Sequence, residues 1–250
     1  MFDCKCDICK GSKYYEVVDR ETNESIYHKT SCYKKYQELN DLRYQLYLSN
    51  ISDFLLDYTL DKYVGKDEDN NLKKVKLFID KFDEKFCKQW LYFWSTEYGT
   101  QKTTIASYIG LELLKKNKKV NFILMNNLIN LLKDVDYIKD DIEKENTQYK
   151  IQKLKDSDLL IIDESFDKRS VTIYQSGYQL AFLDTFLKER EQLGKAIIFT
   201  SNIYWEEIDT KIFSDKIKGQ LSRKCIYSSL LFKDNISILL NDFNPDELWQ

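Results

Sequence analysis

The sequence predicts an α/β fold, in which a parallel sheet carries helices on both faces and a small metal-binding module precedes it. Two observations support this expectation. From Trp90 onward, short apolar runs alternate with longer segments of helical periodicity, a pattern typical of parallel sheets. Four of the six cysteines lie within the first 32 residues, at spacings that suit a metal ion. We expect two domains, residues 1–49 and residues 50–250.

The composition sets the limits for function. A chain of 250 residues with 43% hydrophobic content is long enough for one large core and a smaller module. Its net charge of −3 provides no overall basic field, so contact with nucleic acid would need a local patch. We find no apolar run of about 18 residues and no signal peptide, which argues against a membrane span and predicts a cytoplasmic protein.

The front of the chain contains a C-x2-C pair and an H-x3-C pair. Cys6 and Cys9 form the first pair, and His28 and Cys32 form the second. In a reducing compartment, front-loaded cysteines indicate metal rather than disulfides. Four ligands of this kind suit tetrahedral zinc, with Cys4 as an alternative to Cys6. A module this small would take much of its folding free energy from the metal.

Between the two pairs, the sequence predicts a β-hairpin, with strands at 14–18 and 25–27 and a turn at 19–24. A helical pattern then runs from residue 28 to about residue 49. Ligands at the start of this helix, four residues apart, can face one side. The layout resembles a treble-clef zinc finger. The helix start also carries lysines and tyrosines, which form either a protein-docking face or a nucleic-acid face: Lys29, Tyr33, Lys34, Lys35 and Tyr36.

The large domain begins with a charged interruption at 66–74 and a helix at 75–87. Strands are expected at Trp90–Trp94, Val120–Met125, Leu159–Ile162 and Ala196–Thr200. Helices are expected at Lys102–Lys116, Leu128–Asp136, Ile138–Lys155 and Gly177–Leu193. Ligands of such sheets bind at the carboxyl ends of the strands, so the polar residues that follow each strand are the candidate site residues.

The first strand leads into a loop and then into Lys102, Thr103 and a helix. This is the layout of a phosphate-binding loop, in which main-chain N–H groups and a lysine hold phosphates. Gly99 is the one glycine in the loop, and Gln101 occupies the position before the lysine where glycine is usual. The candidate nucleotide-binding residues are Thr96, Gly99, Thr100, Gln101, Lys102, Thr103, Thr104 and Asp163.

Two further strand ends supply the chemistry of nucleotide hydrolysis. The run DLLIIDE ends in Asp163, which would hold Mg²⁺ with Thr103, and in Glu164, which would polarise the attacking water. The run AIIFTSN ends in Asn202, which would orient that water or contact the γ-phosphate. Together the three segments resemble the Walker A, Walker B and sensor 1 motifs of AAA+ ATPases.

The resemblance extends to bacterial replicative helicase loaders of the DnaC/DnaI type, with the IstB-type insertion-sequence ATPases as relatives. It rests on the segments DLLIIDE, LKERE, KAIIFTSN and LSR in this order, and covers roughly residues 51–240. It implies an AAA+ domain behind a front domain that grips the helicase. The richness in Lys, Asn, Ile and Tyr suits an AT-rich genome, such as that of a low-GC Gram-positive bacterium or its phage.

The resemblance also implies roles for arginines. Arg223 corresponds to the arginine finger, which reaches the γ-phosphate held by a neighbouring subunit. Arg190 matches a family arginine on the helix before sensor 1, and we expect it to pair with acids structurally rather than to act in catalysis. The sensor 2 arginine should fall at 232–236, where this chain offers only Lys233. With Gln101 in the loop, weak ATPase activity is the expectation.

Three functions are consistent with these features. The first is an ATP- and Mg²⁺-dependent loader that binds a hexameric replicative DNA helicase and single-stranded DNA and assembles with itself. The second is a transposition ATPase of the IstB type. The third is an adaptor that holds nucleotide without hydrolysing it. The metal module and the modest charge favour the first.

Overall fold

The computed structural model of the chain describes residues 14–18, 24–63, 71–96, 99–167 and 177–229. The chain divides into two compact units, Met1–Leu48 and Ser49–Gln250. Within the described residues, no helix is both long enough and apolar enough to cross a membrane.

The front unit consists of a hairpin and a helix. Strands β1 (Tyr14–Val18) and β2 (Ser25–Lys29) pair antiparallel, and α1 (Ser31–Leu48) follows. The rings of Tyr14 and Tyr33 lie 5.2 Å apart between their centroids, which joins the hairpin to the start of the helix. The predicted strands and helix are therefore confirmed, except that β2 continues through residues 28 and 29 and the helix begins only at Ser31. Residues 19–23 of the predicted turn lie outside the described residues.

The second unit contains a five-stranded sheet in the order β4-β5-β6-β3-β7, and every neighbouring pair is parallel. Its strands are β3 (Trp90–Trp94), β4 (Val120–Leu124), β5 (Leu159–Asp163), β6 (Ala196–Ser201) and β7 (Cys225–Ser229). The four predicted strands are confirmed to within one residue at each end. Strand β3, the first of this unit in sequence, lies between β6 and β7, which are the last two.

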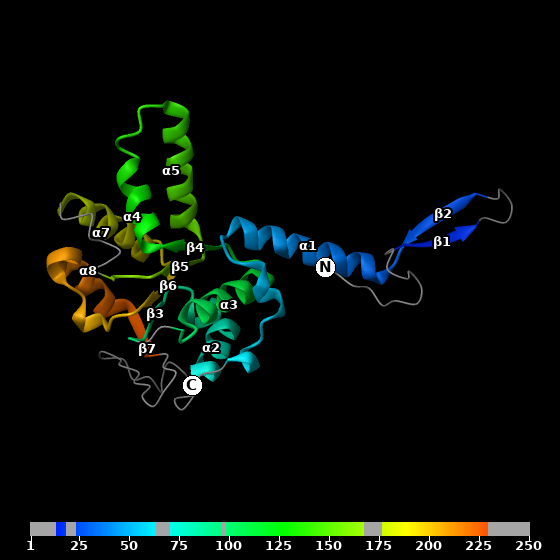
Figure 1. Ribbon diagram of the computed structural model, residues 1–250, viewed down its shortest axis with the longest axis horizontal. Coiled ribbons are helices and arrows are strands. Elements are labelled where there is room, and N and C mark those ends of the chain that lie inside the picture. The colour runs from blue at the N-terminus through cyan, green and yellow to red at the C-terminus, as the bar shows by residue number, and fades with distance from the viewer. Residues whose placement is uncertain (1–13, 19–23, 64–70, 97–98, 168–176, 230–250) are drawn as a thin grey trace. The chain divides into compact units, whose positions relative to one another are not determined.

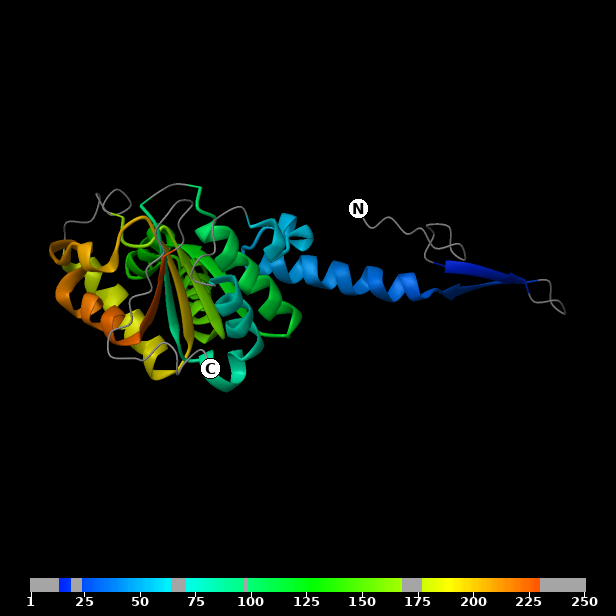
Figure 2. The ribbon, with the colours of Figure 1, turned by 90° about the horizontal axis from the view of Figure 1, so that it is seen from below.

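Helices cover both faces of this sheet (Figures 1 and 2). They are α2 (Asn71–Asp80), α3 (Lys102–Lys115), α4 (Met125–Asp134), α5 (Asp141–Asp156), α7 (Gly177–Gln192) and α8 (Thr210–Lys224). Helix α3 packs on β4, β5 and β6 and against α2, whereas α4, α7 and α8 pack on one another over the opposite face. Alternate residues of β5 divide accordingly. Ile161 meets α3 at Gly110, and Ile162 joins the core that contains Met125 and Phe186.

The segment before β3 differs in part from the expectation. Short 3-10 turns form at η1 (Asp53–Asp57) and η2 (Leu60–Lys62). Helix α2 begins at Asn71, inside the predicted charged interruption, and ends at Asp80. A π-helical turn, η3 (Phe82–Phe86), then completes the segment expected to be one helix. Asn71, Val75, Phe78 and Phe82 are buried, so tertiary packing of this apolar face extends the helix over a polar start.

Arg190 of α7 is fully buried and uses its guanidinium to join three elements. It donates hydrogen bonds to the main-chain oxygens of Leu154, Lys155 and Ser157 at the end of α5, at 2.6, 2.9 and 3.2 Å. Another goes to the oxygen of Ala196 in β6, at 2.5 Å. Burial lowers the pKa of the guanidinium to about 9. Within the described residues these bonds replace the expected pairing with acids, and Arg190 caps a helix end.

Candidate functional site

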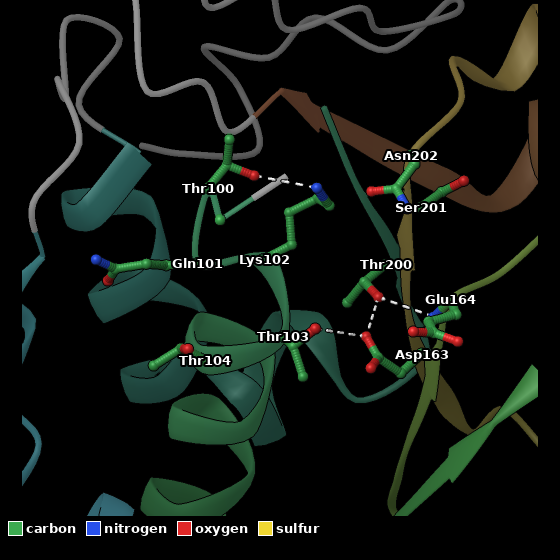
Figure 3. A pocket seen from close by; sticks show the side chains of 11 residues that line it. Thr100, Gln101, Lys102, Thr103, Thr104, Asp163, Glu164, Thr200, Ser201 and Asn202 are labelled. Carbon is green, nitrogen blue, oxygen red and sulfur yellow. Dashed lines mark hydrogen bonds between the residues drawn. The ribbon is translucent and has the colours of Figure 1, made fainter. Parts of the chain in front are cut away.

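A cavity of about 300 Å³ lies at the carboxyl ends of β3, β5 and β6 (Figure 3). The residues that line it are Gly99, Thr100, Gln101, Lys102, Thr103, Thr104, Asp163, Glu164, Thr200, Ser201 and Asn202. The register of the parallel strands explains why they meet. Trp94 of β3 pairs with Ser201 of β6, and Ile162 of β5 pairs with Phe199. The three strands therefore end at one level, and the residues that follow them share one edge of the sheet.

Lys102 begins α3 and is buried. Its Nζ donates to the hydroxyl of Thr100 at 3.0 Å and to the main-chain oxygen of Ser95 at 3.3 Å. Burial lowers the pKa of the ammonium group to about 8, an effect that the nearby Asp163 carboxylate opposes. The amino group is thus held at the start of a helix, where the helix dipole also favours anions.

Asp163 is buried at the end of β5 and accepts hydrogen bonds from two hydroxyls. Thr103 of α3 donates to its Oδ1 at 2.8 Å, and the hydroxyl of Thr200 on β6 donates to the same oxygen. Thr200 also accepts a hydrogen bond from the main-chain N–H of Glu164, at 3.3 Å. These contacts bring one carboxylate and two hydroxyls together in one cluster of oxygen atoms, beside the backbone of Glu164. Hard divalent cations prefer oxygen ligands.

Among the described residues of the loop between β3 and α3, Gly99 and Gln101 have positive φ. Gly99 has φ of 76°, and Gln101, the residue before the lysine, has φ of 60° and ψ of 19°. Glycine adopts this left-handed conformation readily, whereas a residue with a Cβ pays about 1–2 kcal/mol. The sequence therefore located the departure from the glycine pattern correctly. The structure adds that the chain keeps the left-handed turn despite the side chain.

Two predicted site residues lie outside the lining of the cavity. Thr96 lies two residues after the end of β3, and its side chain is exposed. Arg223, in the last turn of α8, is exposed as well, so the cavity of a single chain does not include it. The predicted sensor 2 position, with Lys233, lies outside the described residues.

Two residues of the cavity carried no role in the sequence-based prediction. Thr200 contacts the buried carboxylate, as described above. Ser201 holds the backbone, because its main-chain oxygen accepts from the N–H of Ser95 at 3.2 Å and its hydroxyl donates to the oxygen of Ser165 at 2.7 Å. In the sequence, the change from an apolar run to Thr-Ser-Asn marks the end of the strand. It does not reveal which group each hydroxyl contacts.

The predicted zinc ligands are only partly described. Cys32 lies in the first turn of α1 as predicted, whereas His28 lies in β2 and not in that helical turn, because it pairs with Tyr15 of β1. Cys4, Cys6 and Cys9 lie outside the described residues. Within the described part of the chain, no group of three or more His, Cys, Asp or Glu side chains could hold a metal ion. The zinc site therefore stays a prediction.

Comparisons with known proteins identify the fold. No known protein family and no curated protein matches the sequence. Among solved structures, the DnaC helicase loader is similar, with a TM-score of 0.57 and 17% identity over 72% of this chain and 100% of that chain. DnaI is similar with a TM-score of 0.50 and 16% identity over 71% of this chain and 87% of that chain.

The replication initiator DnaA, bound to AMPPCP and single-stranded DNA, is similar with a TM-score of 0.54 and 17% identity over 70% of this chain. The match covers 50% of that chain, so the present chain spans about half the length of the initiator it matches. At these identities the likeness establishes the fold. The predicted α/β fold, a parallel sheet with helices on both faces, is confirmed, and it is similar to the fold of the DnaC helicase loader.

Replacing Thr200 with valine should lower the free energy of unfolding by about 1–3 kcal/mol, because the buried Asp163 carboxylate loses a donor while the volume stays similar. Thr200→Ser keeps the hydroxyl and should cost much less. Urea unfolding of the two variants beside the unmodified protein measures the difference. Equal stability of Thr200→Val and the unmodified protein would show that this hydroxyl does not support the carboxylate.

Proposed function

We propose that this protein is an ATP-dependent loader of a replicative DNA helicase and that the cavity holds ATP with Mg²⁺. The observation that supports this best is the combination of Lys102 at a helix start with the Thr103–Asp163 hydrogen bond opposite it. The first suits phosphates, and the second suits a divalent cation. The fold shared with the DnaC helicase loader supports a role in DNA replication.

Each residue of the cavity then has a role. Main-chain N–H groups from Gly99 to Thr104 would hold the phosphates, and Lys102 would contact the β- and γ-phosphates. Thr103 and Asp163 would hold Mg²⁺, which neutralises charge on the phosphates when bound. Glu164 would accept a proton from the attacking water, and Asn202 would orient that water. These roles use oxygen and nitrogen groups that already line one cavity.

Lys102→Ala should abolish binding of a fluorescent ATP analogue, whereas Lys216→Ala, an exposed lysine on α8, should leave it unchanged. In the unmodified protein, affinity should fall as pH rises through about 8, because the free Lys102 loses its proton there and only the charged form attracts phosphate. Fluorescence titrations from pH 7 to 9.5 measure both effects. Tight binding by Lys102→Ala would refute the proposed site.

Hydrolysis is proposed to need self-assembly. Arg223 is exposed at the end of α8 and lies outside the cavity lining of its own chain, as a residue that serves a neighbouring subunit would. There it would stabilise the charge that develops on the γ-phosphate, the role of an arginine finger. The left-handed Gln101 in the loop is consistent with slow turnover.

Mixing Glu164→Ala with Arg223→Ala chains should give more ATPase activity than either variant alone, because some interfaces then combine an intact Glu164 with an intact Arg223. Mixing Glu164→Ala with Lys102→Ala is the matched control. Those two residues serve the same chain's site, so no rescue is expected. A lack of rescue in the first mixture, once native mass spectrometry has shown mixed oligomers, would place Arg223 outside the reaction.

The front unit is proposed to bind zinc and to dock on a hexameric replicative helicase. Two short strands are only marginally stable alone, and a metal held by Cys6, Cys9, His28 and Cys32 would stabilise them. The start of α1 presents exposed lysines beside Tyr33 and Tyr36, a surface suited to a protein partner. The ATPase unit would contact single-stranded DNA, a ligand present in the DnaA structure.

Purified full-length protein should contain about one zinc per chain, and His28→Ala should lose both the zinc and the binding of the helicase. His28→Cys replaces one zinc ligand with another and should retain both. Elemental analysis and a helicase pull-down without nucleotide provide the measurements, and residues 50–250 alone should fail to bind. Helicase binding that survives His28→Ala would separate docking from the metal.

Two alternatives stay open to the same experiments. A non-hydrolysing adaptor would bind nucleotide through Lys102 but show no turnover in any assembly. A transposition ATPase of the IstB type would bind duplex DNA, and its affinity would fall steeply with salt, because phosphate contacts release counterions. A helicase interaction that needs the front unit favours the loader over both.

A further inference from the structure

The side chain of Gln101 does not enter the cavity that its backbone lines. Figure 3 shows it directed away from Asp163 and Glu164, on the far side of the start of α3. There its Oε1 accepts a hydrogen bond of 3.1 Å from the hydroxyl of Tyr58. Forty-three positions separate the two residues in the sequence, so this contact joins the phosphate loop to a distant segment.

Tyr58 is held firmly enough to act as an anchor. It caps η1, where its main-chain N–H donates to the oxygen of Leu55 at 3.0 Å. Its ring meets that of Tyr108 on α3 edge to face, with centroids 5.6 Å apart. Burial raises the pKa of the Tyr58 phenol, so the hydroxyl remains a donor at neutral pH.

The segment that carries Tyr58 is itself fixed to the body of the unit. Leu55 is buried, and Ile51 packs where a Cβ on Gly110 of α3 would collide with it. At the start of the segment, the N–H of Phe122 in β4 donates to the oxygen of Ser49 at 2.8 Å. The hydroxyl of Tyr58 therefore has a defined position beside the loop.

We propose that Tyr58 and Gln101 are positioning residues for the phosphate loop, and that their hydrogen bond holds the left-handed turn before Lys102 in the conformation that receives phosphates. The inference rests on the proposed nucleotide site and deepens it. A glycine at position 101 would adopt the turn without help. Glutamine disfavours the left-handed turn, but its side chain accepts a hydrogen bond from Tyr58, which glycine could not do. The hydrogen bond therefore compensates for the cost of glutamine in the turn.

A double-mutant cycle tests this coupling. Tyr58→Phe removes only the hydroxyl and should weaken binding of ATP by roughly 3- to 10-fold, the effect of one neutral hydrogen bond. In the Gln101→Gly background, the same change should have no effect, because the turn no longer needs the tether. Tyr108→Phe, which removes a hydroxyl from the neighbouring ring, is the control and should leave the affinity unchanged.

Pyrophosphate separates positioning of the loop from contact with the base. If Tyr58 acts through the loop, Tyr58→Phe should weaken pyrophosphate binding by the same factor as ATP binding. A loss confined to ATP would mean that Tyr58 touches the nucleoside, and an equal loss in the Gln101→Gly background would mean that it acts without Gln101. Either result, or no loss at all, overturns the proposal.

Failure of the proposed function gives a different result. If the unmodified protein binds neither ATP nor pyrophosphate, the cavity is not a nucleotide site and the positioning role falls with it. Urea unfolding needs no ligand. Applied to the unmodified protein, Tyr58→Phe, Gln101→Gly and the double variant, it would still show whether the Tyr58–Gln101 bond stabilises the fold. Coupling in unfolding without coupling in affinity would make the bond a structural contact only.

Discussion

Asp163 accepts hydrogen bonds from hydroxyls on two different elements, Thr103 at the start of α3 and Thr200 at the end of β6. A buried carboxylate needs such donors, because it has lost its contact with water. Each hydroxyl can reach the carboxylate only if its backbone lies at the right height along the sheet. The two hydrogen bonds therefore constrain the positions of α3 and β6 relative to β5. The position of Lys102 at the base of α3 follows from the same constraint. The geometry of the cavity therefore depends on one charged group and its two donors.

The sequence predicts the framework around this group well. Strands such as Leu159–Asp163 are buried on both faces, so they appear as continuous apolar runs that are easy to find. The start of α2 was harder to predict, because Asn71 and the lysines after it look like loop residues and only burial of Val75 and Phe78 makes them helical. β7 had no such signal, since Cys225–Ser229 contains only three apolar or aromatic residues and ends in two serines.

Site residues divide in a similar way. Lys102 and Thr103 could be placed at the strand end because a loop motif sets their order, and Asp163 because an apolar run ends at it. The role of Thr200 depends on strand register, which no motif states. The partners of Arg190 are main-chain oxygens, which every residue type provides, so no sequence pattern reveals them. Tyr58 escaped notice for a related reason, because its contact exists only through a side chain that replaces the expected glycine.

The strand order has a consequence for synthesis on the ribosome. β3 lies inside the sheet between β6 and β7, yet it is the first strand of this sheet to be made, and its neighbour β6 follows about 100 residues later. At 5–20 residues per second, the segment Trp90–Trp94 waits roughly 5 to 20 seconds for a partner. During that time an aromatic, β-prone strand stays unpaired on the nascent chain. The topology that assembles the cavity thus makes the unfinished chain dependent on protection from aggregation, by chaperones or by slow release.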